Sequence, residues 1–593
     1  MPKRIVRMMV FISCLVLLYG CSAMKWRVAS MALDLPPSTY GVKVEKNVAV
    51  EMRDGVKLYG DIYRPSKSGK YPVILLRTPY DKSNKVQKYA LMGKVFASHG
   101  YIFVVQDVRG RYMSEGEFVP FVNEHIDGAD TIIWADGQSW STGRVGMFGL
   151  SYHGSTQWLA ASDAPDALKT IVPCVTSQDM YRLWANRGVF KYNQLYIWHY
   201  LHEERERRPG DVMSLGDELL GLPLVEADDV AYGDNRVYNE YVRNSVPGEF
   251  WRRMSVDDKV QKIRVPALLV AGWNDPFVEA MLDDYNRMRL SGGSDLARQS
   301  RIIIGPWEHN TRTKFEALDY GRQSRFTRIM IHVLRWYDYW LKGENNGILE
   351  EDPVMLFVMG DNTWRSEKQW PSERTAYVNY YLRSDGDAGE KGKSGKLSGT
   401  KPGDERFDTY IYDPENPVPT IGGEAVYENM FPGPADQHSI EQRPDVLVYT
   451  SEPLRNDMEI TGNVSLVLYV SSSAGDTDFV ARLCDVYPDG KSIGLTTGIV
   501  RARYRASLES PELLENDKVY PLEINVGATS NVFKKGHRIR LHVTSSDFPR
   551  FDRNLNTGDE IGITSKMLKA SQRVYHETDR ASYLVLPVIL EKS

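Results

Sequence analysis

Cysteine is scarce in this chain, with four residues in 593. Cys14 and Cys21 lie close to the N-terminus, whereas Cys174 and Cys484 lie far apart. The cysteines show neither the short paired spacing of a zinc site nor the density of a disulfide framework. The sequence therefore predicts domains that are held together by their hydrophobic cores, without a structural metal.

An excess of positive charge is also missing. The formal net charge is −5 at pH 7, and no block of basic residues interrupts the chain. Proteins that bind nucleic acid present clustered Lys and Arg side chains, so we expect no nucleic-acid partner. A P-loop, a dinucleotide fingerprint and a cluster with metal-ligand spacing are absent as well, and we expect no cofactor.

Long apolar runs are missing, and the run at the N-terminus is short. Met8–Leu18 follows three basic residues and is too short to span a bilayer. Leu18-Tyr-Gly-Cys21 then matches a bacterial lipobox. We expect residues 1–20 to be a lipoprotein signal peptide, Cys21 to carry the lipid, and residues 21–40 to form a tether. Cleavage would change the formal net charge from −5 to −8.

This prediction implies a protein anchored in the bacterial cell envelope, on the periplasmic face of a membrane or at the cell surface. The alternative is an ordinary signal peptide with an incidental cysteine. The sequence leaves open which membrane would hold the anchor and which oligomeric state the protein adopts.

Ser151 lies at the junction between an apolar strand-like run and a helix-compatible stretch, Ser155–Ala161. Such a strand–turn–helix is the context of a nucleophile elbow, in which a strained turn exposes a serine hydroxyl. The turn needs small flanking residues, and Gly149 precedes Ser151 at the required position. The second glycine falls at Gly154, because His153 occupies the usual position.

Two later segments supply candidates for an acid and a base. Val265–Gly272 is predicted to be a buried strand followed by Asp275, and Ser300–Gly305 another followed by His309. Parallel α/β sheets place their sites just beyond strand C-termini. The chain order Ser…Asp…His is that of the α/β-hydrolases. We predict a Ser151 nucleophile, a His309 base and an Asp275 partner that orients the base.

Other residues compete for these roles. His125 begins a helix and is predicted to be structural, and His153 precedes Asp275 in the chain, which does not fit the Ser…Asp…His order. Asp107 is expected to support the floor of the site. The remaining carboxylates either precede the nucleophile or lie in a helix after Asp275: Asp127, Asp136, Asp283 and Asp284.

The order of predicted elements divides the mature chain. Strands alternate with helices over 41–174 and 256–350, which is typical of a mostly parallel sheet. Residues 175–255 interrupt this pattern with two predicted helical segments, Arg182–Arg208 and Tyr238–Arg253, and we interpret them as a helical cap over the serine. Short strands dominate 351–593 and favour an all-β sandwich or jelly roll, beginning with a strand at Met355–Met359.

Several motifs together resemble those of the CocE/NonD hydrolases, which are related to the Xaa-Pro dipeptidyl-peptidases and the α-amino-acid ester hydrolases. The matching segments run from about residue 44 to the C-terminus and include Met52-Arg-Asp-Gly-Val-Lys-Leu58, Arg77-Thr-Pro-Tyr80, Gln106-Asp-Val-Arg-Gly110, Gly149-Leu-Ser-Tyr-His-Gly154, Gly272-Trp-Asn-Asp275, Gly305-Pro-Trp-Glu-His309 and Ser545-Ser-Asp-Phe-Pro-Arg550.

The resemblance implies an α/β-hydrolase domain, a helical cap and a C-terminal jelly roll, in agreement with the pattern of elements. It also implies that an oxyanion hole combines the Tyr80 hydroxyl with the backbone N–H of Tyr152. The substrate would be a small ester or a short peptide or amide.

The residues that follow Asp275 bear on specificity. The α-amino-acid ester hydrolases carry acidic residues just after the catalytic Asp, where this chain has Phe277 and Val278. We therefore expect an esterase for uncharged or aromatic acyl groups, because an ammonium without a carboxylate partner would be poorly paired. A dipeptidyl-peptidase or other amide hydrolase is the alternative, with Glu203, Glu204 or Glu279 as candidate amine ligands. A catalytically dead binding protein is a third possibility.

Overall fold

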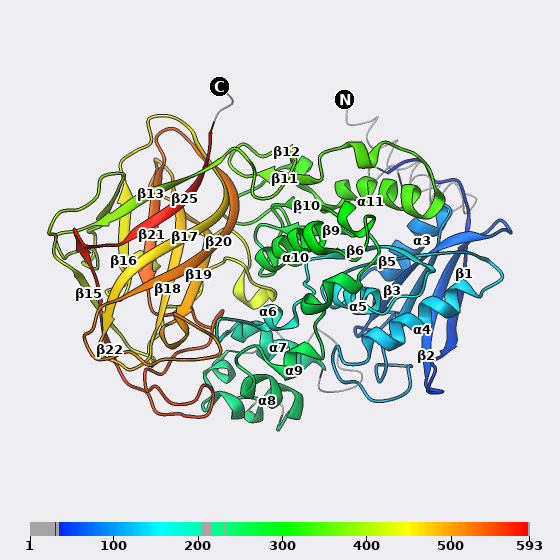
Figure 1. The fold of residues 1–593 in the computed structure, drawn as a ribbon, viewed down its shortest axis with the longest axis horizontal. Helices are drawn as coiled ribbons and strands as arrows, with labels where there is room; N and C mark the ends of the chain where they lie inside the picture. Colours follow the sequence, from blue (N-terminus) through cyan, green and yellow to red (C-terminus); the bar gives the residue numbers. More distant parts are fainter. Residues whose placement is uncertain (1–29, 31–34, 203–215, 231–232, 591–593) are drawn as a thin grey trace, which may run out of the picture.

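The computed structural model describes residues 30, 35–202, 216–230 and 233–590. The predicted signal peptide, Cys21, most of the predicted tether, Glu203 and Glu204 lie outside the described residues. Figure 1 shows two lobes, with an α/β domain on the right and a β-sandwich on the left. Helices from the middle of the chain lie below and between them (Figure 1).

The α/β lobe is built on a ten-stranded sheet in the order β1-β2-β4-β3-β5-β6-β9-β10-β11-β12. Strands β3, β4, β5, β6, β9, β10 and β11 run parallel, which agrees with the predicted mostly parallel sheet, and an antiparallel hairpin of β1 and β2 extends one edge. The strands are β1 Val42–Glu51, β2 Lys57–Pro65, β3 Tyr71–Thr78, β4 Ile102–Asp107, β5 Ser141–Leu150, β6 Leu168–Cys174, β9 Leu268–Gly272, β10 Arg301–Gly305, β11 Val354–Val358 and β12 Thr363–Glu367.

Helices cover both faces of this sheet. Side chains of each central strand alternate between two cores, so that Val73 and Leu75 face one core and Ile74 and Leu76 the other. Burial on both faces explains the continuous apolar runs of these strands. The first core packs on α4 (Glu124–Asp136), α5 (Tyr152–Ala161) and α10 (Val278–Ser291), and the second on α3 (Tyr89–Ser98) and α11 (Met330–Tyr337).

The cap lies between β6 and β9 in the chain. It contains α6 (Met180–Trp184), a hairpin of β7 (Ala185–Asn186) and β8 (Val189–Phe190), α7 (Tyr192–His202), α8 (Arg236–Arg243) and α9 (Glu249–Arg252). The prediction of one helix over Arg182–Arg208 is wrong in its described part, because a turn at Gly188 with φ of 79° divides it. Tyr238–Arg253 is divided as well, by Pro247 and Gly248, which disfavour a continuous helix.

The second lobe is an eleven-stranded sheet folded around one apolar core, which confirms the all-β prediction. Its pairing is antiparallel except between β14 and β16. The strands are β13 Thr375–Arg383, β14 Gly395–Ser398, β15 Asp408–Tyr412, β16 Leu447–Ser451, β17 Met458–Ser472, β18 Asp478–Val486, β19 Ser492–Arg501, β20 Tyr520–Phe533, β21 Arg538–Thr544, β22 Ala570–Val574 and β25 Tyr583–Ile589; the small pair β23 His576–Glu577 and β24 Arg580–Ala581 lies beside them.

One predicted sandwich strand belongs to the other lobe. Met355–Met359 was expected to begin the sandwich, but β11 pairs in parallel with β10 and therefore extends the α/β sheet. The apolar run is compatible with either sheet, so its composition does not decide between them. The reason is tertiary: β11 covers the open edge of β10, and β12 then pairs with β11.

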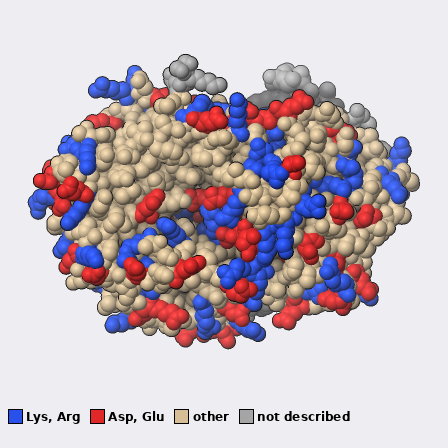
Figure 2. Space-filling model, viewed as in Figure 1, with Lys and Arg blue, Asp and Glu red and all other residues tan. Residues whose placement is uncertain are grey.

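The surface is mixed in charge. In Figure 2 basic and acidic side chains are interspersed and gather where the two lobes meet. In the part of the chain that the structure describes, no helix has the length and apolarity needed to cross a membrane.

Candidate active site

Ser151 occupies a strained turn between β5 and α5. Its φ of 59° and ψ of −127° are unusual for a residue other than glycine, and strain of this kind is concentrated at functional sites. A Cβ at Gly149 would lie 2.4 Å from the Cβ of His153, and one at Gly154 would lie 2.4 Å from Cγ2 of Thr176. Both glycines are therefore required by close packing around the turn.

Asp275 and His309 meet at the C-terminal edge of the sheet. Asp275 follows β9, His309 follows β10, and the two strands are parallel neighbours. The imidazole Nδ1 of His309 lies 2.6 Å from the Asp275 carboxylate, which is fully buried. The second carboxylate oxygen of Asp275 accepts from the backbone N–H of Phe277 at 2.9 Å. This arrangement fixes the ring of His309 and leaves its Nε2 as the nitrogen available to a hydroxyl.

The loops that carry these two residues are bonded to each other. The backbone N–H of Trp273 donates to Gly305 at 2.7 Å, and that of Asn274 donates to Trp307 at 3.0 Å. The Asn274 side chain donates to the Pro306 carbonyl at 2.9 Å. Asp275 and His309 therefore belong to one hydrogen-bonded unit.

Tyr80 follows β3 and points to the same edge. Its backbone N–H donates to the Thr78 hydroxyl at 3.0 Å, and its carbonyl accepts from Asn84 at 3.0 Å. The indole of Trp198, on α7, lies 3.3 Å from the Tyr80 hydroxyl. Burial raises the pKa of Tyr80, and hydrogen bonds with Trp198 and Ser151 partly offset this effect. The hydroxyl is therefore protonated near pH 7 and lies within hydrogen-bonding reach of Ser151.

Tyr152 contributes differently from Tyr80. As the first residue of α5 it presents its backbone N–H at a helix N-terminus, where the first four N–H groups have no acceptor within the helix. Its side chain points away from this N–H and donates to Glu124 at 2.8 Å. Its ring stacks on Phe121 with a centroid distance of 4.4 Å.

The competing histidines have other places. His153 is buried, its Nδ1 lies 2.5 Å from the Leu150 carbonyl, and its Nε2 lies 2.7 Å from the Tyr89 hydroxyl. Burial lowers the pKa of His153 to about 4, so the ring is neutral near pH 7. His125 lies on α4 and is not part of the pocket around Ser151.

The competing carboxylates also serve the scaffold. Asp107 accepts from the backbone of Lys82 at 2.6 Å and pairs with its ammonium at 3.3 Å, which holds the loop after Tyr80, as the floor role predicts. Burial raises the pKa of Asp107 to about 7. Asp127 pairs with Arg109, and Asp136 is the last residue of α4. Asp283 pairs with Arg182, and Asp284 accepts from the backbone N–H of Gln178.

Ser151 and His309 line one pocket, whose volume is about 340 Å³ when its open mouth is included. Its described lining contains no carboxylate and is mostly aromatic. The α/β lobe, the cap and the sandwich all contribute. The lining residues are Tyr80, Phe121, Ser151, Tyr152, Ser155, Thr176, Leu183, Trp184, Gln194, Trp198, Phe277, His309, Val426 and Tyr427.

Sequence reasoning missed several residues in and around this pocket. Val426 and Tyr427 come from a long sandwich loop with no motif, and Asn310 anchors that loop by donating to the Val426 carbonyl at 3.0 Å. Glu308 is fully buried and accepts from the backbone N–H groups of Asn310 and Arg312, which shapes the turn after His309. Its place beside His309 in the motif was the available signal.

Of the three carboxylates that the sequence offered for binding an amine, Glu279 alone lies within the described residues, and it does not line this pocket. Its carboxylate accepts from Asn525 at 2.7 Å in an adjacent cavity. A possible metal-binding group within the described residues comprises Asp228, Asp229 and Asp234, on the cap before α8. These side chains do not line the pocket of Ser151, and nothing else marks them as a site.

Comparisons with known proteins agree with this architecture. Residues 54–311 match the model of the X-Pro dipeptidyl-peptidase (S15 family), and residues 346–585 match that of the X-Pro dipeptidyl-peptidase C-terminal non-catalytic domain. A cocaine esterase from Rhodococcus sp. (strain MB1 Bresler) is 39% identical over 575 residues, which cover 92% of this chain and 98% of that protein.

Solved structures are similar over nearly the whole length. The crystal structure of an aminopeptidase from a marine sediment archaeon, Thaumarchaeota archaeon, has 26% identity and a TM-score of 0.80, covering 93% of this chain and 97% of that one. An α-amino acid ester hydrolase has 27% identity and a TM-score of 0.79, covering 92% and 96%. On this evidence the chain is a serine hydrolase and belongs to the CocE/NonD family, which is related to cocaine esterase, the S15 Xaa-Pro dipeptidyl-peptidases and the α-amino acid ester hydrolases.

Proposed function

We propose that this protein hydrolyses carboxylic esters of uncharged or aromatic acids through an acyl-enzyme on Ser151. One observation carries the proposal: the strained serine and the His309–Asp275 pair open into a single aromatic pocket without a carboxylate in its described lining. The similarity to a protein named cocaine esterase supports ester hydrolysis in particular.

The proposed reaction has two halves. Nε2 of His309 takes the proton of Ser151 as Oγ bonds to the ester carbon, and the tetrahedral intermediate collapses when the alcohol leaves with that proton. Water then attacks the acyl-enzyme, His309 again accepts and returns the proton, and the carboxylic acid is released. The buried Asp275 carboxylate stabilises the imidazolium at each stage and does not itself take up the proton.

Two donors are proposed to stabilise the oxyanion. The Tyr152 N–H lies at the start of α5, where the helix dipole adds a favourable potential for negative charge. The Tyr80 hydroxyl is held beside Ser151 by the bonds to its loop and by Trp198. Each preorganised donor of this kind contributes about 3–4 kcal/mol to the transition state.

The aromatic side chains of the pocket wall indicate which kind of acyl group the pocket would bind. Phe121, Trp184 and Trp198 lie on the side of Tyr80, with centroid distances of 6.0 Å between Phe121 and Trp198 and 5.2 Å between Trp184 and Trp198. Flat aromatic walls favour a planar or short apolar acyl chain, because the gain comes from apolar area removed from water.

Amide hydrolysis is the weaker alternative. Two matched family models and one similar structure carry peptidase names. Dipeptidyl-peptidases must pair the free amine of their substrate, and an ammonium would find no carboxylate in the described lining of this pocket.

We also propose that the protein is a lipoprotein of the bacterial cell envelope, anchored through Cys21. The support is the sequence alone: a basic segment, an apolar run too short to span a membrane, and the lipobox.

Ester turnover by the soluble chain from residue 22 tests the main proposal. We expect hydrolysis of p-nitrophenyl acetate, butyrate and benzoate, and a loss of at least 10³-fold in kcat/KM in Ser151→Ala, because no other group replaces the nucleophile. Gly-Pro-p-nitroanilide is the comparison substrate. A strong preference for it would contradict the ester proposal, and turnover that persists in Ser151→Ala would contradict the nucleophile.

The two proposed oxyanion donors can be distinguished by Tyr→Phe substitutions, because Tyr80 would donate through its side-chain hydroxyl and Tyr152 through its backbone N–H. Tyr80→Phe is expected to lower kcat by about 10²–10³ with little change in KM, because the lost bond strengthens only in the transition state. Tyr152→Phe keeps its N–H and is expected to lose less than tenfold. Steady-state kinetics with p-nitrophenyl butyrate decide between these outcomes; equal losses in both variants would argue against the Tyr80 role.

Lipid anchoring predicts how the full-length chain partitions. Expressed in a bacterial host, the wild-type protein should enter the detergent-rich phase of a Triton X-114 separation. Cys21→Ser should partition into the aqueous phase once residues 1–20 have been removed. The matched control is Cys174→Ser, a buried cysteine that is expected to partition like the wild type. Detergent-phase recovery of Cys21→Ser would exclude Cys21 as the anchor, if the intact mass shows that residues 1–20 have been removed.

A further inference from the structure

A second cavity lies directly beside the catalytic pocket. The cap, the α10 region and the sandwich all line it, and Gln194 and Val426 line both cavities. Its walls are polar, in contrast to the aromatic walls around Ser151. An ester has an acyl half and an alcohol half. The aromatic catalytic pocket has the apolar character that suits only the acyl half proposed above.

Lys191 stands out among the residues of this cavity. Its ammonium donates to the carbonyls of Arg182 and Pro276, both at 2.8 Å. An ammonium has three donors, so a third remains for a group in the cavity. Among the described residues no carboxylate forms an ion pair with Lys191.

The other charged groups of the cavity already have partners. Glu424 pairs with Arg550 at 2.6 Å, Glu279 accepts from Asn525 at 2.7 Å, and Arg182 pairs with Asp283. By contrast, the amide nitrogen of Asn193 is buried and has no acceptor. Lys191 and Asn193 therefore offer spare donors to the cavity, and leaving such donors unpaired is unfavourable. The missing partner is a group rich in acceptor oxygens.

The position of Lys191 indicates which half of the ester the cavity would hold. The ring of Phe277 contacts both Lys191 and His309: the ammonium lies 5.2 Å from its centroid, and the imidazole packs edge-on with a centroid distance of 5.3 Å. His309 must deliver its proton to the leaving alcohol, so the alcohol lies on the His309 side. The acyl group then lies on the side of Tyr80 and Trp198.

We propose that this cavity is a leaving-group subsite that binds a carboxylate on the alcohol portion of the ester, with Lys191 as its charged partner. The inference rests on the proposed ester hydrolysis and names its substrate class more closely. Burial lowers the pKa of Lys191 to about 7, and a carboxylate at 3 Å or so would raise that pKa and keep the ammonium charged.

Three benzoate esters with different alcohols test the proposal on the wild-type protein. Benzoyloxyacetate carries a carboxylate, benzoyloxyacetamide is its neutral counterpart, and benzoylcholine carries a cation. We expect kcat/KM for the carboxylate to exceed that for the amide by about tenfold, the effect of one charge-assisted hydrogen bond. Equal values for these two esters, or a preference for benzoylcholine, would overturn the proposal.

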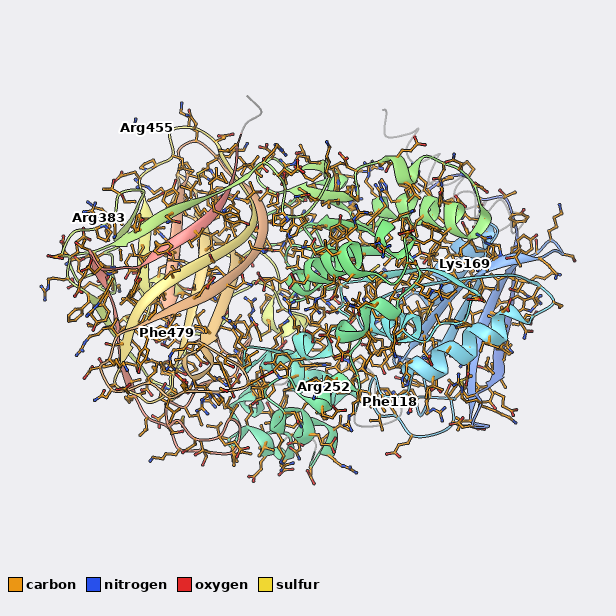
Figure 3. All side chains as sticks on the ribbon, viewed as in Figure 1. Phe118, Lys169, Arg252, Arg383, Arg455 and Phe479 are labelled. Atoms are coloured by element: carbon orange, nitrogen blue, oxygen red, sulfur yellow. The ribbon has the colours of Figure 1, made fainter. Side chains whose placement is uncertain are left out.

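Substitutions then locate the effect. In Lys191→Met the carboxylate-to-amide ratio should fall to about one, and Lys191→Arg should keep most of it. Lys169→Met is the matched control: Lys169 lies on β6 in the α/β lobe (Figure 3), where its ammonium donates to the Asp166 carbonyl. A ratio that survives in Lys191→Met would overturn the assignment.

The ratio also separates two kinds of failure. Lys191→Met loses the bonds to Arg182 and Pro276, so turnover of all three esters falls together if the role of Lys191 is structural, and the ratio stays as in the wild type. If the wild type hydrolyses the amide but does not favour the carboxylate, the subsite proposal fails alone. If it hydrolyses none of the three esters, the subsite proposal fails together with the proposed esterase function.

Discussion

The hydrogen bond between buried Asp275 and His309 is the constraint on which the rest of the site depends. A carboxylate at zero exposure is unfavourable unless it is paired and accepts further bonds, and Asp275 accepts from both His309 and the Phe277 backbone. The scaffold meets this requirement by joining the two loops through Trp273 and Asn274. The indole of Trp273 also donates to the Phe357 carbonyl on β11 at 2.7 Å, so this edge strand supports the loop that carries Asp275.

The pocket exists because three parts of the chain are bonded together around that pair. Cap residues Tyr192 and Asn193 donate their backbone N–H groups to Arg550 and Pro549 of the sandwich. Arg501 of the sandwich binds Asp478, Asp552 and the Gly188 carbonyl of the cap hairpin, all in a buried setting. Removing one partner from a buried ion pair strongly destabilises the folded protein. The walls around Ser151 are therefore set by interdomain contacts, not by the α/β lobe alone.

The sequence predicted the fold class and the three candidate residues of the site because these depend on local patterns. Apolar runs that end in Gly149, Gly272 and Gly305 mark strand ends, and parallel strands bring the loops after those ends to one edge of the sheet. The strand at β11 was placed in the wrong lobe because an apolar run does not specify its neighbour. β19 is hard to recognise from the sequence, since its two glycines and polar residues weaken the strand pattern. Val426 reaches the pocket of Ser151, and Lys191 the cavity beside it, only through tertiary packing, which no local pattern reports.

The central claim is that the Asp275–His309 bond activates Ser151. The rate at which a fluorophosphonate labels the protein at pH 7 tests it most directly, with peptide mass mapping of the adduct in the wild type and in Asp275→Asn. The account predicts one adduct on Ser151, formed roughly 10³–10⁴ times more slowly in Asp275→Asn, because the amide no longer holds the required tautomer of His309. An adduct on another residue, or an unchanged rate in Asp275→Asn, would contradict it.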